Sequence, residues 1–487
     1  MSSLDEIRAE RIRKVNLLEA AGVDPYPSKS LCSIEIGALL KNFEAHFLDR
    51  TVLTVHGRIR ATRIHGGSIF LDLDDGSGRI QIFLQRNEIG AEEFDLFVGA
   101  GDTGDFIEIS GTPFKTKHGQ DSINAVSWRM LSKTLRPIPD DWYGLSDENE
   151  RFRRKYLDMI LNKNVLENAK KRSVFWNSFR TYLLTRDFIE VETPVLENTT
   201  GGADARPFIT HHNALDIDVY LRISAGELWQ KQLLVGGLTK TFEIGRIFRN
   251  EGMSREHLQD YTQLEFYQAY SDYTQGMQMV IDLYRYVAEK TFGKMNFSIG
   301  EHVVNLESDW VTYDFCEIIQ KEYGLDPLSV SLEEVKSALI KYGVEKDMDS
   351  INIERGIDTL WKRIRKTISG PGFLIGVPVY LEPLAKRNSE NKNVVDRFQV
   401  IIAGSEMGKG FSELNNPIDQ KERFLNQQAL RDAGDDEAQM ADMDFVEALE
   451  YGMPPAFGFG VSERLFSFLM DVDVREGQLF PLMRPRF

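Results

Sequence analysis

The sequence contains few cysteines and no long apolar run. Cys32 and Cys316 are the only cysteines among 487 residues, and neither belongs to a CxxC motif or a Cys/His cluster. A disulfide framework or a structural zinc site is therefore not expected, and a reducing cytoplasm suits the chain. No apolar run reaches the roughly 20 residues of a membrane helix, and the first residues do not resemble a secretory signal. These absences predict a cytoplasmic protein with no membrane partner.

Positive charge is also in short supply. The chain has 58 Lys and Arg against 75 Asp and Glu, a net charge of −17. Phosphate neutralisation needs Lys and Arg, so this balance argues mildly against a nucleic-acid partner. A protein that contacts RNA over a limited surface can nevertheless be acidic elsewhere. Length and an ordinary hydrophobic content of 42% predict two or three globular domains.

The first 136 residues divide into a helical and a strand-rich part. Residues 1–50 are predicted to form a helical extension that begins with a basic helix over 4–21, which is either a solvated face or an RNA contact. Residues 51–136 show three strand patterns, a short helix near 91–99 and two further strands. That order is typical of a five-stranded OB-fold barrel, which commonly presents a strand face to single-stranded nucleic acid.

The rest of the chain reads as one large α/β region behind a linker. Prolines and acidic residues over 137–149 indicate the linker. Residues 150–487 follow, with strand-rich segments at 188–270 and 371–415. A mostly helical insertion is expected over about 274–370.

A polar hairpin carries the first sign of chemistry. Two strand patterns flank a polar loop at 253–260, and alternation on the return strand places Gln263, Glu265 and Tyr267 on one face. Burying such a polar face costs free energy unless a ligand occupies it. The alternative is an exposed sheet face with incidental ion pairs.

Several motifs resemble those of one enzyme family. Phe248-Arg-Asn-Glu-Gly resembles motif 2 of the class II aminoacyl-tRNA synthetases, and Glu265-Phe-Tyr-Gln-Ala-Tyr is similar to their lysyl subgroup. Gly201-Gly-Ala-Asp-Ala-Arg-Pro-Phe is also lysyl-like. Phe188-Ile-Glu-Val-Glu-Thr-Pro-Val-Leu resembles motif 1, and Gly458-Phe-Gly-Val-Ser-Glu-Arg-Leu resembles motif 3. The whole chain is thus similar to a class IIb lysyl-tRNA synthetase.

This resemblance implies a multidomain α+β fold and a defined reaction. An antiparallel sheet flanked by helices would form the catalytic domain, and the barrel would bind the anticodon. The enzyme would activate L-lysine with ATP to lysyl-adenylate, releasing diphosphate, and transfer lysine to the 3′-terminal ribose of tRNA(Lys). Mg²⁺ is expected with ATP. Motif 1 implies a homodimer with Pro194 at the interface.

The resemblance also implies roles for residues at the ATP site. In-line attack of a carboxylate on the α-phosphate needs positioning and charge neutralisation. Arg249 would bridge the two reacting groups and Arg464 would hold the γ-phosphate, so both are expected to be catalytic. Tyr261 would stack on adenine. The other ATP-binding residues implied are Glu251, His257 and Glu406.

Lysine recognition requires acceptors for two ammonium groups. Strand alternation places Lys409, Phe411 and Glu413 on one face. The resemblance implies that Glu413 and Tyr267 bind the ε-ammonium and that Phe411 packs on the aliphatic stem. The residues implied at the α-amino group are Gly202, Glu227 and Glu265. In the barrel, Phe70 and Gln81 match positions that read the anticodon.

The sequence departs from the family pattern near the active site. One residue is added ahead of Glu227 and one is missing from motif 3. The family's two-carboxylate metal site reads Gln399 and Glu406, and Lys409 replaces a usual Asn. We therefore expect a weaker metal site with fewer ions and Lys409 as a substitute cation. Alternatively, Lys409 pairs with Glu406 in the empty enzyme and moves away when ATP binds.

Three other functions remain possible from the sequence. An aspartyl or asparaginyl enzyme of class IIb shares this architecture but should carry basic groups in place of Glu413 and Glu265. A non-catalytic RNA-binding paralogue should have lost Arg249 or Arg464. Enzymes that attach lysine to a protein are similar to this chain, but they lack the barrel domain that is predicted here.

Overall fold

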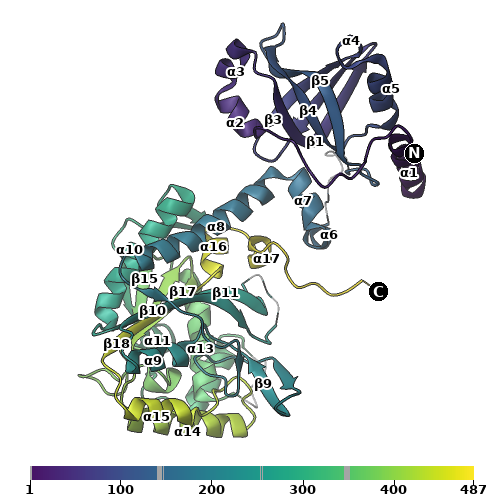
Figure 1. Cartoon of the computed structure of the whole chain (residues 1–487). Coiled ribbons are helices and arrows are strands. Elements are labelled where there is room, and N and C mark those ends of the chain that lie inside the picture. The colour runs from purple at the N-terminus through teal and green to yellow at the C-terminus, as the bar shows by residue number, and fades with distance from the viewer. Residues whose placement is uncertain are drawn as a thin grey trace. The chain divides into compact units, whose positions relative to one another are not determined.

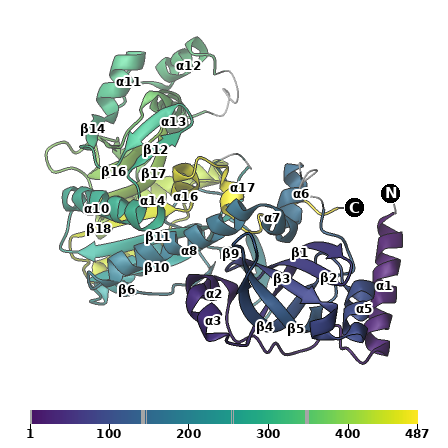
Figure 2. The same cartoon turned by 90° about the horizontal axis from the view of Figure 1, so that it is seen from above.

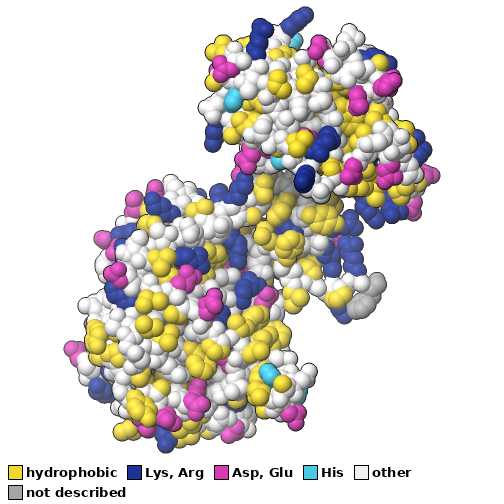
Figure 3. Space-filling view, viewed as in Figure 1, with side chains coloured by type: hydrophobic (Ala, Val, Ile, Leu, Met, Phe, Trp, Pro, Cys, Tyr) yellow, Lys and Arg dark blue, Asp and Glu magenta, His cyan; other side chains and the backbone are white. Residues whose placement is uncertain are grey.

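The structure is a computed structural model that describes residues 3–139, 145, 147–252, 254, 256–344 and 351–486. The chain divides into two compact units, Met1–Ser146 and Asp147–Phe487 (Figure 1). On the face drawn in Figure 3, basic and acidic side chains are interspersed over both units, so the excess of acid forms no single acidic surface there. None of the helices in the described ranges is long and apolar enough to cross a membrane.

The first unit contains the predicted OB-fold. Its described residues form a closed barrel in the order β1-β2-β3-β5-β4, in which β3 and β5 are parallel and the other neighbours antiparallel. Alternate apolar side chains fill the interior, as period-two patterning requires. The strands are β1 Leu53–His65, β2 Ser68–Asp74, β3 Arg79–Gln85, β4 Phe106–Lys115 and β5 Asp121–Ser132.

Five described helices surround the barrel, and the first is fixed to it by basic residues. A capping box between Ser3 and Glu6 begins α1. Arg11 is buried and donates to the carbonyl oxygens of Thr103 and Arg136, while Lys14 pairs with Asp102 at 2.7 Å. Two of the helix's basic groups therefore serve the fold. The helices are α1 Leu4–Ala20, α2 Ile36–Lys41, α3 Phe43–Asp49, α4 Arg86–Ile89 and α5 Ala91–Ala100.

The predicted linker over 137–149 lies partly outside the described residues, and α6 begins within it at Glu148.

The second unit is built on a central sheet. Its described strands run in the order β14-β15-β16-β17-β18-β11-β10-β6. They are β6 Ile189–Glu190, β10 Lys240–Phe248, β11 Asp260–Ala269, β14 Val311–Asp314, β15 Gly372–Ile375, β16 Arg397–Ile402, β17 Ser405–Ser412 and β18 Ala456–Ser462.

The sheet is mixed at its two edges, although an antiparallel sheet was expected. β6 is parallel to β10 and β14 is parallel to β15, while the strands between β15 and β10 are antiparallel. Parallel neighbours need a long crossover connection. Helix α9 with the small sheet β7-β9-β8 separates β6 from β10, and α11 to α13 separate β14 from β15.

Helices α8 and α10 lie side by side on one face of this sheet (Figure 2). Phe179 of α8 and Val280 of α10 belong to one buried cluster with Phe266, Phe398 and Phe459 of the strands. Burial of such side chains contributes about 1.5–3 kcal/mol each. Because Phe266 faces these helices, its neighbours Glu265 and Tyr267 point to the opposite face.

The remaining elements of the second unit connect and cover the sheet. The segment expected to be a helical insertion contains α11 to α13 and also the short strands β12 to β14. The short strands outside the main sheet are β7 Leu196–Glu197, β8 Ile209–His212, β9 Ile217–Leu221, β12 Asn296–Ile299 and β13 His302–Asn305. The helices are α6 Glu148–Arg153, α7 Lys155–Leu161, α8 Lys163–Leu184, α9 Glu227–Val235, α10 Tyr273–Phe292, α11 Phe315–Tyr323, α12 Leu332–Lys341, α13 Ile353–Ile364, α14 Pro417–Asp432, α15 Met443–Glu450, α16 Arg464–Leu469 and α17 Val474–Gly477.

Candidate active site

A cavity of about 850 Å³ lies against the polar face of the central sheet. Strands β11, β16, β17 and β18 provide its floor, and residues from α9, α13 and several loops provide its walls. The residues predicted to bind ATP, lysine and metal, together with Lys409, all line this one cavity. They are Gly202, Glu227, Arg249, Glu251, His257, Tyr261, Glu265, Tyr267, Gln399, Glu406, Lys409, Phe411, Glu413 and Arg464.

Two glycines make room for the polar groups. A Cβ atom at Gly458 would overlap Oε1 of Glu413 and the ring of Tyr267. Gly202 has φ +85° and a Cβ there would lie 2.6 Å from Oγ of Ser224, close to the start of α9. Glycine is therefore required at both positions on geometric grounds.

Carboxylates gather at one end of the cavity. Glu227, the first residue of α9, and Glu413, the residue that follows β17, are both buried. Lys231 lies between them, with Nζ 2.7 Å from Oε1 of Glu227 and 2.6 Å from Oε2 of Glu413. Glu265 of β11 is a third buried carboxylate in this group. It accepts hydrogen bonds from the Ala225 N–H at 2.9 Å, the Tyr267 hydroxyl at 2.9 Å and the Gln263 amide at 2.6 Å.

Burial makes Glu265 and Glu413 hard to ionise. It raises the pKa of Glu265 to about 7, and repulsion from Glu227 adds to the rise. Burial also raises the pKa of Glu413 to about 8, against the opposing effect of Lys231. This end of the cavity is therefore short of positive charge, because buried carboxylates need a partner to stay ionised.

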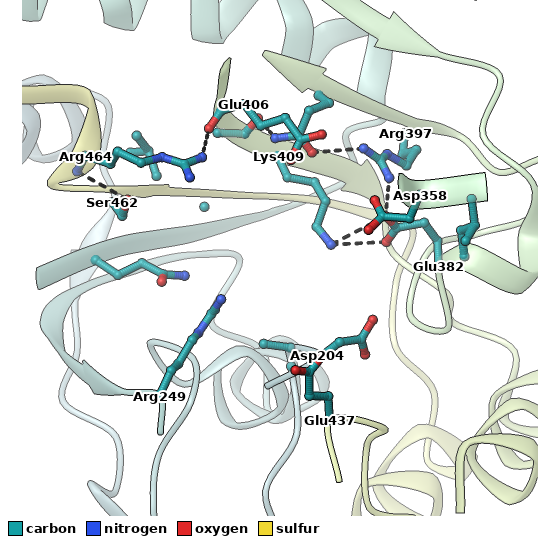
Figure 4. Close-up of a pocket in the computed structure, with 18 of the residues that line it drawn as sticks. Asp204, Arg249, Asp358, Glu382, Arg397, Glu406, Lys409, Glu437, Ser462 and Arg464 are labelled. Atoms are coloured by element: carbon teal, nitrogen blue, oxygen red, sulfur yellow. Dashed lines mark hydrogen bonds and ion pairs between the residues drawn. The ribbon is translucent and has the colours of Figure 1, made fainter. Parts of the chain in front are cut away.

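Another part of the cavity, called the cationic end below, contains Arg464 and Arg365 near Glu406, and Figure 4 shows Arg464 beside Glu406. Arg464, the first residue of α16, donates to the backbone carbonyl of Glu406 and lies 3.7 Å from Oε2 of Glu256. The Trp361 indole donates to the Glu406 carboxylate at 2.7 Å. Burial alone would raise the pKa of Glu406, but Arg365, Trp361 and Arg464 outweigh it and hold the pKa low. Glu406 is therefore ionised in a surplus of positive charge.

The motif 2 residues lie between β10 and β11. Arg249 donates from Nε to the Ile223 carbonyl at 3.1 Å, and its guanidinium carbon is 5.8 Å from the Tyr261 ring centroid. The His257 ring lies 2.6 Å from Oγ of Ser254. Burial lowers the pKa of His257, and Arg464 lowers it further, so this imidazole is neutral at pH 7.

Lys409 pairs with Glu382 rather than with Glu406. Its Nζ donates to Oε2 of Glu382 at 3.2 Å, as Figure 4 shows. Glu382 also pairs with Arg397, which donates at 2.9 Å to Oε1 of Gln399. The Gln399 amide nitrogen donates to the Gly408 carbonyl at 2.9 Å. Both ends of the Gln399 amide are thus occupied by protein groups.

Several residues of this site were missed by sequence reasoning. Lys231 could have been found from the sequence, because it lies four residues after Glu227 on one helix and this spacing predicts an ion pair. Glu382 lies next to a 3-10 turn and Arg397 begins β16, and no spacing connects them to Lys409. Trp361, on α13, is far from Glu406 in sequence.

The predicted anticodon residues lie on the barrel of the first unit. Phe70 stacks on Phe83 with ring centroids 4.7 Å apart, and Phe83 is 5.8 Å from Phe114. All three rings are half-buried. Gln81 accepts from the Ser122 hydroxyl at 3.2 Å. The alternation of β2 and β3 could have revealed Phe83, because it lies opposite Phe70 in the register.

Comparison with known proteins assigns both units. Residues 147–484 match the family described as tRNA synthetases class II (D, K and N). The chain belongs to this family. Residues 53–131 match the OB-fold nucleic acid binding domain.

Curated relatives of this synthetase match nearly its whole length. The lysine–tRNA ligase of Carboxydothermus hydrogenoformans is 42% identical over 99% of this chain and 99% of its own. That of Roseiflexus sp. (strain RS-1) is 41% identical over 99% of both chains. That of Thermotoga maritima is 40% identical over 99% of this chain and 97% of its own.

Proposed function

We propose that this synthetase is a lysine–tRNA ligase that converts lysine and ATP to lysyl-adenylate and diphosphate and then charges tRNA(Lys). The observation that carries the amino-acid assignment is the group of buried carboxylates Glu227, Glu265 and Glu413 at one end of the cavity. Their shortage of positive charge suits a substrate with two ammonium groups. The similarity to lysine–tRNA ligases over the full length supports the same assignment.

In the activation step, two arginines would position and neutralise the reacting groups. The lysine carboxylate attacks the α-phosphorus of ATP, the bond to the bridging oxygen breaks, and diphosphate leaves. Arg249 would contact the carboxylate and the α-phosphate, since a guanidinium can bind both in one plane. Arg464 would hold the γ-phosphate at the cationic end. Adenine would stack on Tyr261, with Glu251 at its amino group and neutral His257 close to the phosphates.

At the carboxylate end, Glu413 and Tyr267 would bind the ε-ammonium and Phe411 would pack on the methylene stem. Glu227, Glu265 and Gly202 would surround the α-amino group. A neutral or shorter side chain would leave a buried carboxylate without a partner, which costs several kcal/mol. This is the physical basis for selecting lysine.

The rival assignments fit less well. The substrate of an aspartyl or asparaginyl enzyme would place a carboxylate or amide against Glu413 and Glu265, where repulsion or desolvation would oppose it. A non-catalytic RNA-binding paralogue has no need for Arg249 and Arg464 in one cavity with these carboxylates. A protein-lysylating enzyme would lack the barrel that residues 53–131 match.

Enzymes of this family act on ATP with Mg²⁺, but a metal site that uses Gln399 does not fit the arrangement. The Gln399 oxygen already accepts from Arg397. Glu406 remains as an anionic oxygen donor, and the described residues contain no group of three or more His, Cys, Asp or Glu suited to a metal ion. We therefore propose that fewer ions bind and that Lys409 neutralises phosphate or substrate carboxylate in their place. Its side chain is 44% exposed in the cavity, so it can reach a ligand.

The barrel would read the anticodon through its aromatic face. Phe70, supported by Phe83 and Phe114, offers a stacking surface for an unpaired base. Gln81, held by Ser122, would hydrogen-bond to a base edge. The anticodon lies in a loop of the tRNA, where unpaired bases can stack on aromatic side chains and form hydrogen bonds.

A homodimer in the cytoplasm completes the proposal. The motif 1 segment around Pro194 exposes apolar side chains, including Ile189 at 48%, Val195 at 42% and Leu196 at 49%. Exposed apolar side chains gathered in one segment are typical of an interface. A two-fold interface would bury the same patch of both protomers.

Replacing Glu413 by Gln should weaken lysine binding far more than ATP binding. One charge partner of a desolvated ammonium is lost, which costs about 2–5 kcal/mol and raises KM for lysine about 30-fold or more. Lysine-dependent pyrophosphate exchange measures both KM values. Glu197→Gln is the control, because Glu197 is also buried but does not line the cavity. An unchanged lysine KM in Glu413→Gln contradicts the assignment.

Replacing Phe70 by Ala should impair tRNA charging and leave lysine activation intact. Loss of one stacking contact costs about 1–3 kcal/mol, so KM for tRNA should rise about 5- to 150-fold. Aminoacylation and pyrophosphate exchange are measured on the same protein. Val98→Ala, an exposed substitution on α5, should change neither. Normal charging by Phe70→Ala would exclude Phe70 as an anticodon platform.

Replacing Leu196 by Asp should dissociate the dimer. A charge at an apolar two-fold interface is repeated on both protomers, so its cost is paid twice. Sedimentation velocity at micromolar protein should show a dimer for the original chain and a monomer for the variant. Ile418→Asp, at a 79% exposed position on α14, should remain dimeric. A stable monomer of the unaltered protein would reject the proposal.

Replacing Lys409 by Asn should make activation more dependent on Mg²⁺. If the ammonium does part of the neutralisation, the variant loses activity at low Mg²⁺ and partly recovers as Mg²⁺ rises. Mg²⁺ titrations of pyrophosphate exchange test this, with Lys321→Asn on α11 as the control. Metal stoichiometry measured with Mn²⁺ and a non-hydrolysable ATP analogue gives a readout independent of activity. Identical Mg²⁺ curves for both proteins would disprove a role for Lys409.

A further inference from the structure

Lys231 is the one charged group of the carboxylate cluster, among the described residues, that does not line the cavity. It lies one helical turn after Glu227 on α9, and its side chain is 1% exposed. It contacts Glu227 and Glu413 at 2.7 and 2.6 Å. The two carboxylates face the cavity, whereas Lys231 approaches them from within the protein.

Aromatic rings enclose this ammonium. Its Nζ lies 5.3 Å from the ring centroid of Phe411 and 6.0 Å from those of Tyr267 and Phe445. Such contacts favour a cation, more so when it is desolvated. Burial alone would lower the pKa of Lys231, but Glu227 and Glu413 outweigh it and raise the pKa. The ammonium is therefore a permanent charge of the pocket wall.

The charge of the cluster follows from its members. Fully ionised, Glu227, Glu265 and Glu413 carry three negative charges against one positive charge on Lys231. Other charged or titratable groups also act on the cluster. They are Tyr267, which stays neutral, Arg249, which lowers the pKa of Glu265, and Glu197 and Tyr261, which also interact with Glu265. Glu227, Glu265, Glu413 and Lys231 by themselves lack two positive charges. L-Lysine supplies that number in its α- and ε-ammonium groups.

The Glu413 carboxylate also has capacity for a further partner. Neither of its oxygens has a hydrogen bond of good geometry from the described residues, although Lys231 lies close to one of them. Buried acceptors are normally satisfied. An ammonium that enters from the cavity would donate the missing hydrogen bonds to the Glu413 carboxylate, which Lys231 contacts from within the protein.

We infer that Lys231 is a positioning residue that sets the charge of the amino-acid pocket, so that the pocket is complementary to a ligand with two ammonium groups. The inference rests on the proposed function and deepens it. Lys231 contacts both Glu227 and Glu413, and it opposes the rise in the pKa of Glu413 that burial causes. It thereby favours the carboxylate form of Glu413, which can accept hydrogen bonds from a substrate ammonium. Without Lys231, Glu413 would retain its proton to higher pH and would be a poorer acceptor for a substrate ammonium.

The test is the pH dependence of lysine binding. In the unaltered enzyme, lysine affinity should rise as pH increases through about 7 to 8, because Glu265 and Glu413 lose protons in that range. In Lys231→Met this rise should move upward by about one pH unit or more, so that KM for lysine is at least about tenfold higher at pH 7 and recovers toward pH 9. KM for ATP should not change. Lys231→Arg keeps the charge and should keep the original pH profile, even if its KM is raised by poorer packing.

Two controls separate charge from stability. Lys155→Met removes another buried lysine of the same unit, paired with Asp158, and should leave the lysine profile unchanged. Lys231→Gln is a second neutral variant should Lys231→Met fail to fold. A loss of lysine affinity that is independent of pH, or failure of both neutral variants to fold, overturns the inference in favour of a purely structural role. Absence of lysine-dependent exchange in the unaltered enzyme would instead reject the proposed function.

Discussion

Desolvation of neighbouring carboxylates governs the energetics of the catalytic unit. Taking an ionised carboxylate out of water costs several kcal/mol even after relaxation, and Glu227, Glu265 and Glu413 share one buried site. Lys231 offsets part of this cost, and three hydrogen-bond donors orient Glu265. The remainder is left to the ligand. We propose that the ammonium groups of the substrate supply the missing positive charge, which would make binding selective.

Such a site requires a rigid frame, and the sheet supplies it through its opposite face. The aromatic cluster under α8 and α10 holds β11, β16 and β18 together, because Phe266, Phe398 and Phe459 of these strands pack against one another. Because successive residues of a strand point to opposite faces, this packing also fixes the direction of Glu265. A shift of one residue in the pairing of a strand would turn its core side chains toward the pocket and its pocket side chains toward the core. The hydrophobic core therefore sets the geometry of the polar site.

Strand alternation was enough to predict which side chains of β11 and β17 share a face. The residues that the family motifs indicated all line one cavity in the structure. Contacts between distant segments could not be predicted in this way. Glu382 has no periodic pattern around it, so its pair with Lys409 had no local signal. The link from Lys231 to Glu413 joins a helix to a strand far along the chain. The parallel edges of the sheet likewise depend on crossover connections rather than on the strands' own sequences.

The pocket that we propose for lysine must also exclude the lysine side chains of the protein itself. Lys409 is close to the carboxylate end, since its Nζ lies 5.9 Å from the Phe411 ring that Lys231 also approaches. An ammonium there would compete with the substrate for Glu413. In the structure, Lys409 instead donates to Glu382 at 3.2 Å, and Glu382 also pairs with Arg397. The Lys409 ammonium is therefore bound to a carboxylate other than Glu413, and its half-exposed side chain stays available to an anionic ligand.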